Sequence, residues 1–212
     1  MTFDIGPAQN ISGQAGVAAE LLWGSSHHYL ECLYGGDKQQ ALEDLQYHWQ
    51  QPAGLLSHKH AIVVTEIGES EILGLALAFC GGIKNVETET IINHITELTT
   101  AEMVPGYFER LEALNQFHPD VPEKAFYLQN IAINASLRGN GIGEQLFRSI
   151  VVWAQNGHHE TMQLDVVSDN PAVKFYIRLG MEIKAETDVP ELRTKYDQPS
   201  RYRMVLAITP SD

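Results

Sequence analysis

Three glycines at alternate positions, Gly139, Gly141 and Gly143, mark the part of the sequence best suited to binding an anion. They belong to the run Arg138-Gly139-Asn140-Gly141-Ile142-Gly143, between an apolar run at 126–133 and an amphipathic segment that continues to Asn156. Because glycine has no Cβ, a ligand can approach the backbone, and successive N–H groups at a helix start can point at one anion. The positive end of the helix dipole strengthens this attraction. The run therefore indicates a phosphate-bearing ligand.

The residues after the turn limit which phosphate ligand fits. A Walker loop requires Gly-Lys-Ser/Thr, whereas Gly143 is followed by Glu144 and Gln145, so nucleotide hydrolysis is disfavoured. A dinucleotide fingerprint requires Gly-x-Gly-x-x-Gly and an acidic ribose ligand about 20 residues further on. Asp165 stands near that distance, but the glycine spacing here is Gly-x-Gly-x-Gly. A different nucleotide-dependent enzyme, using NAD or ATP, is one alternative that the sequence leaves open.

Arg138-x-x-Gly141-x-Gly143 resembles the pyrophosphate-binding turn of the GNAT superfamily of acyl-CoA-dependent N-acyltransferases. A second stretch, 170–181, reads Asn-Pro-Ala-Val-Lys-Phe-Tyr-Ile-Arg-Leu-Gly-Met and resembles the second signature of that family, with its asparagine opening and its Phe-Tyr-x-x-Leu-Gly-Met/Phe close. The two signatures occur in the family's order and are separated by one expected strand, 162–167. The resemblance is close over residues 126–183 and looser on either side.

The resemblance implies an α/β (α+β) fold of the GNAT-like three-layer type. Its central sheet would be mixed, mostly antiparallel and of about seven strands, with helices on both faces and a helical insertion before the fourth strand. Residues 1–212 would form a single acetyltransferase domain, with the insertion at 84–124 and the cofactor-binding core at 126–183. A chain of 212 residues with 44% hydrophobic content is long enough for one sizeable core.

Apolar periodicity predicts the elements that surround the turn. It indicates a short strand at 3–5, a helical stretch over 14–33 that is interrupted at 24–26, and a helix over 37–50 that Asp37 can cap. Runs at 61–66 and 72–79 predict a hairpin, and runs at 181–186 and 202–208 predict final strands around a polar loop. The helix after the glycine turn is expected to end at Asn156-Gly157.

The segment 84–124 is longer than an ordinary connection and mostly helical in pattern. Between Glu87 and Glu123 it holds eight acidic residues and one arginine. Two interpretations stay open: a lid that selects cations, or a solvated helical hairpin packed through its apolar face.

The resemblance implies acetyl-CoA as cosubstrate and assigns roles to specific positions. The pyrophosphate would lie on the turn that comprises Arg138, Gly139, Asn140, Gly141, Ile142 and Gly143. The backbone of Ile131, Ala132 and Ile133 would pair with pantetheine like an added strand, with an N–H near Ile133 facing the thioester carbonyl. Asn170 would approach the cofactor and Tyr176 its sulfur. The alternatives are that Asn170 is only a helix cap and that Tyr176 is only a buried aromatic.

The implied reaction is direct attack of an amine on the acetyl thioester, without a covalent enzyme intermediate. Tyr176, with a free pKa of about 10, could protonate the departing sulfur. Deprotonation of the incoming ammonium needs a base or a water chain. The strand before the turn carries Gln129 and Asn130, which can position a water but cannot take its proton. Among carboxylates, Glu66, Glu87 and Glu89 follow or end predicted strands on the acceptor side and are weak candidates for the base.

The net charge of −13 is unevenly distributed. Residues 1–137 carry 17 acidic and 5 basic side chains, whereas residues 138–203 carry nine of each. This distribution suits a polyanionic cofactor and a cationic amine, from a small molecule, a peptide or a protein, and argues against nucleic acid as a partner. The other interpretation is that the acidic excess only keeps the protein in solution. The protein could also form a homodimer. The alternative to an enzyme is a noncatalytic acyl-CoA-binding module.

No membrane anchor or metal site is expected from the sequence. The first residues lack a basic and an apolar signal region, and the longest apolar stretch, 72–79, is too short to cross a bilayer, so a cytoplasmic protein is expected. Cys32 and Cys80 are expected to be buried free thiols. The nine histidines show no spacing typical of a metal site.

Overall fold

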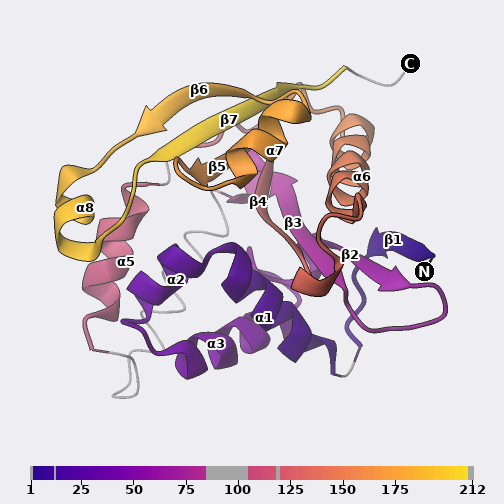
Figure 1. The fold of residues 1–212 in the computed structure, drawn as a ribbon, viewed down its shortest axis with the longest axis horizontal. Helices are drawn as coiled ribbons and strands as arrows, with labels where there is room; N and C mark the ends of the chain where they lie inside the picture. Colours follow the sequence, from indigo (N-terminus) through magenta and orange to yellow (C-terminus); the bar gives the residue numbers. More distant parts are fainter. Residues whose placement is uncertain (1, 12, 85–104, 118–119, 210–212) are drawn as a thin grey trace.

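Seven strands form one mixed sheet in the order β1-β2-β3-β4-β5-β7-β6 (Figure 1). The computed structural model describes residues 2–11, 13–84, 105–117 and 120–209. The strands are β1 (Phe3–Pro7), β2 (Ala61–Glu66), β3 (Gly74–Cys80), β4 (Ala125–Ile133), β5 (Thr161–Val167), β6 (Glu182–Thr187) and β7 (Arg201–Ala207). Neighbouring strands are antiparallel except β4 and β5, which are parallel. The expected mixed, mostly antiparallel sheet of about seven strands is confirmed.

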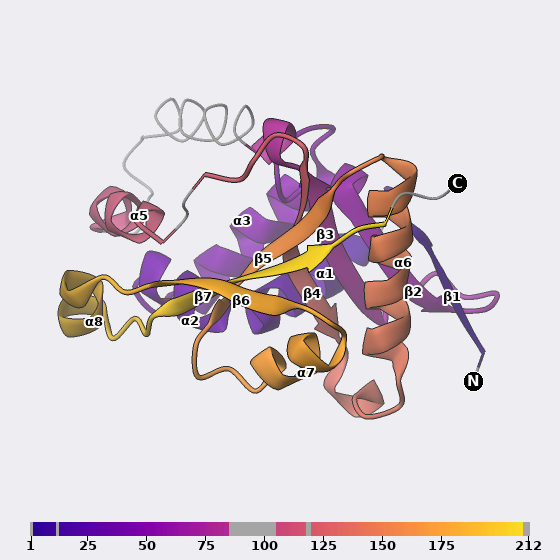
Figure 2. The ribbon, with the colours of Figure 1, turned by 90° about the horizontal axis from the view of Figure 1, so that it is seen from above.

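Seven α-helices are described, and the sheet separates them into two layers. They are α1 (Gln14–Ser25), α2 (His27–Leu33), α3 (Lys38–Gln50), α5 (Tyr107–Asn115), α6 (Ile142–Asn156), α7 (Ala172–Arg178) and α8 (Pro190–Tyr196). Short 3-10 turns occupy His58–His60 and Ala135–Leu137. Figure 2 shows α6 and α7 on the near side together with β6 and β7, in front of the central strands β3 and β4, and α1 and α3 on the far side. The structure therefore has the three layers that the resemblance implied.

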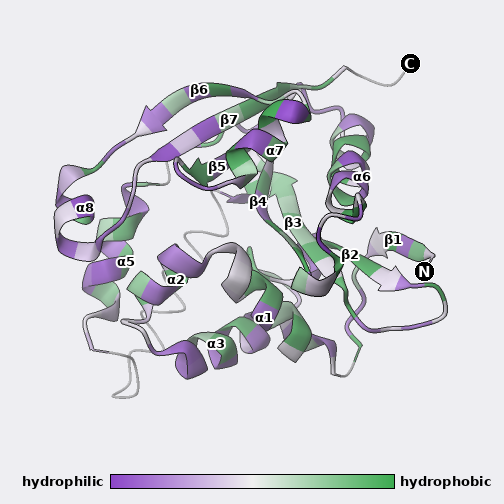
Figure 3. Cartoon of the chain, in the orientation of Figure 1, coloured by the Kyte–Doolittle hydropathy of each residue, from purple (hydrophilic) through white to green (hydrophobic). Residues whose placement is uncertain are grey.

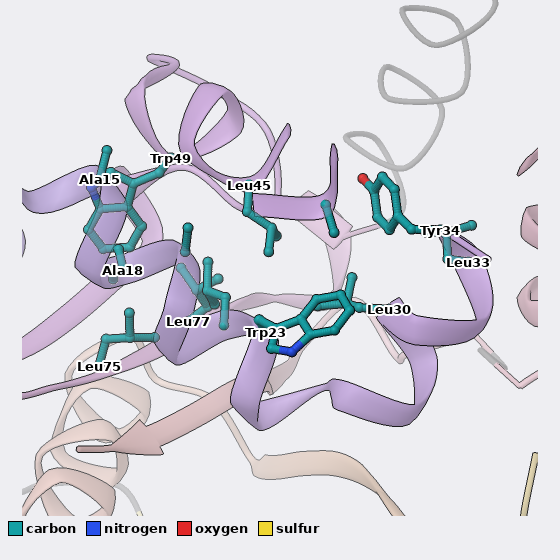
Figure 4. Close-up of a cluster of buried hydrophobic side chains, with 14 of the residues drawn as sticks. Ala15, Ala18, Trp23, Leu30, Leu33, Tyr34, Leu45, Trp49, Leu75 and Leu77 are labelled. Carbon is teal, nitrogen blue, oxygen red and sulfur yellow. The ribbon is translucent and has the colours of Figure 1, made fainter. Parts of the chain in front are cut away.

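The helices α1 to α3 form the layer on one face of the sheet. The break expected near 24–26 separates α1 from α2 at Ser26, and the Asp37 carboxylate accepts a hydrogen bond from the N–H of Gln40 (3.0 Å) at the start of α3. Figure 4 shows the buried side chains of this layer, in which Ala15 and Ala18 of α1, Leu45 and Trp49 of α3, and Leu75 and Leu77 of β3 belong to one cluster. Burial of apolar surface contributes about 25 cal/mol per Å², so this cluster stabilises the packing of the layer on the sheet.

The opposite layer contains α6 and α7. The apolar stripe of α6 includes Leu146, Phe147 and Ile150, all at most 2% exposed, and packs against the other face of the strands. Because both faces of the central strands are covered, β3 is buried over nearly its whole length. Figure 3 shows β3 in the colours of hydrophobic residues, whereas α8 at the edge of the molecule is mostly hydrophilic.

The parallel strands β4 and β5 separate after a short contact. They pair only over Ala125–Tyr127 with Thr161–Gln163 in the described sheet, whereas β4 pairs with β3 as far as Ile133. The register with β3 shifts between Leu77 and Ala78, which leaves Gln129 as an extra residue in β4. A β-bulge bends its strand. The bulge therefore lies where the sheet opens.

Several local expectations need correction. The loop between the last two strands contains α8, which periodicity missed because a seven-residue helix with one buried side chain, Leu192, shows little pattern. The helix α6 ends at Asn156 with Gly157 as its C-cap, as expected, but the left-handed residue is His158 (φ 55°) rather than Gly157 (φ −79°). Cys32 and Cys80 are free but partly exposed rather than buried. Within the insertion, α5 is helical as expected, and residues 85–104 lie outside the described residues.

Candidate active site

A cleft of about 1460 Å³ opens where β4 and β5 separate. One end is formed by the last residues of β4, the glycine turn and the start of α7. The other end is formed by the α1–α2 junction, α2, the end of β5 and the start of β7. The two ends are continuous, so a ligand on the turn and a second ligand near α2 can meet within one space.

The glycine turn has the backbone conformation that its residue types predict. Gly139 and Gly141 have φ of 84° and 78°, in the left-handed region that side chains disfavour. A Cβ at either position would meet no atom within 4 Å, so the backbone faces open space. The N–H groups of Glu144 and Gln145 are the first to bond back, both to the Gly141 carbonyl (3.1 Å). The N–H groups of residues 139–143 therefore precede the hydrogen-bond ladder of α6, as an anion site requires.

Contacts of Gly143 and Arg138 hold the turn against the end of β4. A Cβ at Gly143 would lie 3.7 Å from the Ile133 side chain and 3.9 Å from the ring of Phe175. Arg138 Nε donates to the Ile133 carbonyl (3.3 Å). The turn, β4 and α7 thus meet at one point of the cleft.

Asn170 has the capping role that was one of its two interpretations. Its Oδ1 accepts a hydrogen bond from the N–H of Ala172 (2.8 Å) at the start of α7. The same residue lines the cleft, beside Pro171 and Ala172. Capping and ligand contact are compatible, because one oxygen holds the helix while the amide nitrogen can still donate.

Tyr176 lines the same end of the cleft from α7. It is 7% exposed, and its ring lies 5.4 Å from that of Phe175 and 6.2 Å from that of Phe147, between centroids. Burial raises the pKa of the Tyr176 hydroxyl far above its ordinary value. The phenol therefore keeps its proton throughout the pH range in which enzymes work.

The raised pKa of Tyr176 predicts a loss of stability at alkaline pH. An unfolded tyrosine ionises near pH 10, whereas native Tyr176 stays protonated, so unfolding releases a proton above that pH. The free energy of unfolding should fall by about 1.4 kcal/mol more per pH unit above pH 10 in the wild type than in Tyr176→Phe. Urea unfolding between pH 9 and 11 measures this difference. Parallel pH profiles of the two proteins would contradict it, and the exposed Tyr47→Phe serves as control.

The structure brings most of the predicted site residues to one cleft. Its lining includes Ile131, Ala132, Ile133, Arg138, Gly143, Asn170 and Tyr176. Gly139, Asn140, Gly141 and Ile142 complete the turn between the lining residues Arg138 and Gly143. Among the candidate bases, Glu66 is opposite Phe3 in the β1–β2 pair and does not line the cleft, whereas Glu87 and Glu89 lie outside the described residues.

Asn130 connects β4 to the α1–α2 junction. Its Nδ2 donates to Ser25 Oγ (2.9 Å) and Ser26 Oγ (2.8 Å), and the residue is 7% exposed. Sequence reasoning treated the two serines only as a helix interruption and Asn130 as a residue that could position water. The contact instead fixes the junction over the bulged part of β4, and this was hidden because the residues are more than 100 positions apart in the chain.

A buried charged network crosses the sheet where β4 and β5 separate. Arg203 binds both oxygens of Asp165, at 2.6 and 2.8 Å, and Tyr127 donates to Asp165 Oδ2 (2.9 Å). Burial, followed by the charge of Asp165 and this hydrogen bond, raises the pKa of Tyr127 well above its ordinary value. The alternation of polar residues in β5 and β7 was the only sequence signal of this network.

The described residues show neither a metal site nor a membrane-spanning helix. They contain no group of three or more His, Cys, Asp or Glu side chains arranged to hold a metal ion. None of their helices combines the length and apolar character needed to cross a bilayer.

Comparisons with solved structures agree with this fold. An N-acetyltransferase from Staphylococcus aureus Mu50 is similar, with a TM-score of 0.68 and 18% identity, over 96% of this chain and 100% of that one. A second crystal structure, described as an acetyltransferase, has a TM-score of 0.67 and 19% identity, over 97% and 100%. The NatC complex bound to Gag peptide and CoA contains a chain with a TM-score of 0.56 and 12% identity, over 99% and 100%. At these identities the likeness establishes the fold.

The sequence itself gives the family. No curated protein sequence matches the chain. Residues 23–181 match the model of the acetyltransferase (GNAT) family. The matched range includes the glycine turn, α7 and most of the residues that line the cleft, but not Arg201. This match spans well over half of the 212 residues. The chain therefore belongs to the GNAT family of acetyltransferases and is an acyltransferase.

Proposed function

We propose that the protein is an N-acetyltransferase that transfers acetyl from acetyl-CoA to a primary amine of a small molecule, a peptide or a protein. The observation that carries the proposal is the continuity of the cleft from the glycine turn, past Tyr176, to the α1–α2 junction. One end suits a diphosphate and the other leaves space for an acceptor. Residues 1–212 would act as one domain, with 126–183 as its cofactor-binding core.

The residues present fit acetyl-CoA. The open N–H groups of 139–143 and the guanidinium of Arg138 suit a diphosphate. The edge of β4 from Leu128 to Ile133 is not paired with β5 in the described sheet, so its backbone groups suit an extended amide chain such as pantetheine. Asn170 lies where the two regions meet. When bound there, acetyl-CoA supplies the activated acetyl thioester.

Three groups of the chain would assist the reaction: one stabilises the charge on the carbonyl oxygen, one protonates the sulfur, and one takes the proton of the amine. A backbone N–H near Ile133 would donate to the carbonyl oxygen as negative charge develops on it. The Tyr176 hydroxyl, kept protonated by burial, would donate its proton to the departing sulfur and take up another from solvent as coenzyme A leaves. His28, which lines the acceptor end, replaces Glu66 as our candidate for accepting the proton of the incoming amine, directly or through water.

Tyr176→Phe is expected to lower kcat by about 100-fold, because it removes the proton donor and little else. The ring contacts with Phe147 and Phe175 are retained, so the dissociation constant for coenzyme A should change less than twofold. Steady-state kinetics and isothermal titration calorimetry measure the two quantities. An unchanged kcat would remove Tyr176 from the catalytic role.

The proposed function is tested by thiol release from acetyl-CoA against polyamines, aminoglycosides, amino acids and peptides, with the thermal shift caused by acetyl-CoA recorded in parallel. Turnover with an amine confirms the reaction. A thermal shift without turnover for any amine would favour the noncatalytic acyl-CoA-binding module, and stabilisation by NAD or ATP alone would favour another nucleotide-dependent protein. Homodimer formation, a cytoplasmic location and a cation-selecting role for residues 87–123 stay predictions.

A further inference from the structure

The acceptor end of the cleft contains an arginine that has no acidic partner among the described residues. Arg201, at the start of β7, is 8% exposed and lines the cleft. Its Nε has no hydrogen-bond partner, and no carboxylate of the described residues forms an ion pair with it. The guanidinium carbon lies 5.4 Å from the ring centroid of Tyr29 and 4.8 Å from that of Phe117. Two aromatic faces therefore hold the guanidinium, while its edge is left for another group.

The adjacent arginine on the same face of β7 shows what a paired guanidinium looks like here. Arg203 is bound to both oxygens of Asp165 and to Gln163 Oε1 (3.2 Å). Asp165 is also the acid whose charge acts on Arg201, but its oxygens are already occupied by Arg203 and Tyr127. Both oxygens of Asp165 thus already accept hydrogen bonds from other residues, and Arg201 adds an uncompensated positive charge to the cleft.

A buried guanidinium without a counter-ion is energetically unfavourable, because its desolvation is not offset. Arginine cannot escape by losing its proton. Two further acids, Glu20 and Asp120, line the cleft, but neither forms an ion pair with Arg201, and Glu20 is paired with Lys38 (3.0 Å). The cation of Lys84, which lies 4.6 Å from the Tyr127 ring centroid, lines the same cleft. An anion from outside the described chain is the group that would complete this site.

The position of Arg201 places that anion with the acceptor. Gln198 Nε2, just before β7, donates to the carbonyl of His28 (3.0 Å), so the start of β7 lies beside α2. The glycine turn and Tyr176 are at the other end of the cleft, where the diphosphate and thioester are proposed to bind. The single uncompensated charge of Arg201 matches one negative charge, and its planar fork matches a carboxylate.

We propose that Arg201 binds a carboxylate of the acceptor, so that the substrates are amino acids or short peptides whose amine and carboxylate lie in one molecule. This inference rests on the proposed function and specifies its substrate class. It differs from the expectation, drawn from net charge, that a purely cationic amine is preferred.

The test compares acids with their amides. Acceptors are the twenty amino acids, dialanine and their C-terminal amides, with thiol release from acetyl-CoA as the readout. Arg201→Met keeps an unbranched stem between the two rings and removes the charge. We expect it to lower kcat/KM for the acid by about 10- to 100-fold, mainly through KM, and to leave the amide within about twofold. The ratio between wild type and variant cancels the different basicity of the two amines.

Two controls separate charge from folding. Arg201→Lys keeps the positive charge without the fork and should restore part of the preference. Arg148→Met, on the exposed face of α6, should leave the ratio unchanged. An acid-to-amide ratio that is the same in wild type and Arg201→Met, or a wild type that turns over only polyamines, would overturn the inference.

The result is decisive even if no acceptor is turned over. Calorimetry then measures binding of N-acetylated amino acids and of their amides to the protein with coenzyme A. Binding of the acids that Arg201→Met weakens supports the inference, and equal binding of acids and amides contradicts it. Failure of the proposed function is a different result, namely neither a thermal shift nor thiol release with acetyl-CoA.

Discussion

Gly141→Asp is expected to weaken the binding of coenzyme A by about 100-fold. The position has φ 78° and open space around it, so an aspartate fits there without a clash, and among residues with a side chain aspartate tolerates this conformation relatively well. Its carboxylate would stand among the N–H groups at the start of α6, where the proposed diphosphate binds. Repulsion between like charges and the loss of charge-assisted hydrogen bonds together account for this magnitude.

The matched control is Gly141→Asn, which has the same shape and backbone tolerance without the charge. It should weaken binding by less than about 10-fold, and calorimetry with coenzyme A measures both variants. Pantetheine, which lacks the diphosphate, should bind the wild type and both variants equally. An unchanged affinity of Gly141→Asp for coenzyme A would show that the glycine turn is not the diphosphate site. The proposal that Arg138 binds the diphosphate would then be wrong as well.

The parts of the fold that depend on neighbouring residues could be predicted from the sequence. The stripe of α6, the cap at Asp37 and the β2–β3 hairpin follow from spacings of a few residues. The glycine turn belongs to the same class, because a positive φ at Gly139 and Gly141 is a local property. These features were enough to predict which end of the cleft would bind the cofactor.

The acceptor end could not be predicted, because it depends on contacts between distant residues. The extra residue Gln129 and the separation of β4 from β5 are set by strand registers, which single-strand patterns do not contain. Asn130 reaches Ser25 and Ser26 only after α1 has folded over the sheet. Likewise, the sequence shows Arg201 and Arg203 as equals, and only the structure shows that one is paired with Asp165 and the other is not.

Net charge and the charges inside the cleft favour different acceptors, and the two carry different weight for a related reason. The acidic excess is summed over the whole surface, most of which is exposed to solvent and screened by salt. The cleft responds to the few charges within it, and burial makes each of these count more. Under our proposal Arg201, at 8% exposed, would therefore weigh more for acceptor choice than many exposed carboxylates.

Arg203→Met is expected to reduce the free energy of unfolding by about 3–5 kcal/mol, the usual effect of leaving one member of a buried ion pair alone. The side chains of Arg203 and Asp165 are 10% and 5% exposed, so water cannot replace the lost partner. The Tyr127 hydroxyl would be the remaining donor to the carboxylate. Because the network joins β4, β5 and β7 at the point where the sheet opens, the loss would also loosen the cleft. Urea unfolding followed by circular dichroism measures the change.

Two further variants show whether burial causes this effect. Arg148→Met removes an ion pair with Glu144 whose side chains are 69% and 40% exposed, and should change stability by only about 0.5 kcal/mol. In the double variant Asp165→Leu/Arg203→Met neither member of the pair is left without the other, and apolar side chains fill much of the space, so most of the lost stability should return. If the double variant is as unstable as Arg203→Met, the pair stabilises the fold through the geometry of its hydrogen bonds. The opening between β4 and β5 would then depend on the directed hydrogen bonds of Arg203 rather than on charge balance.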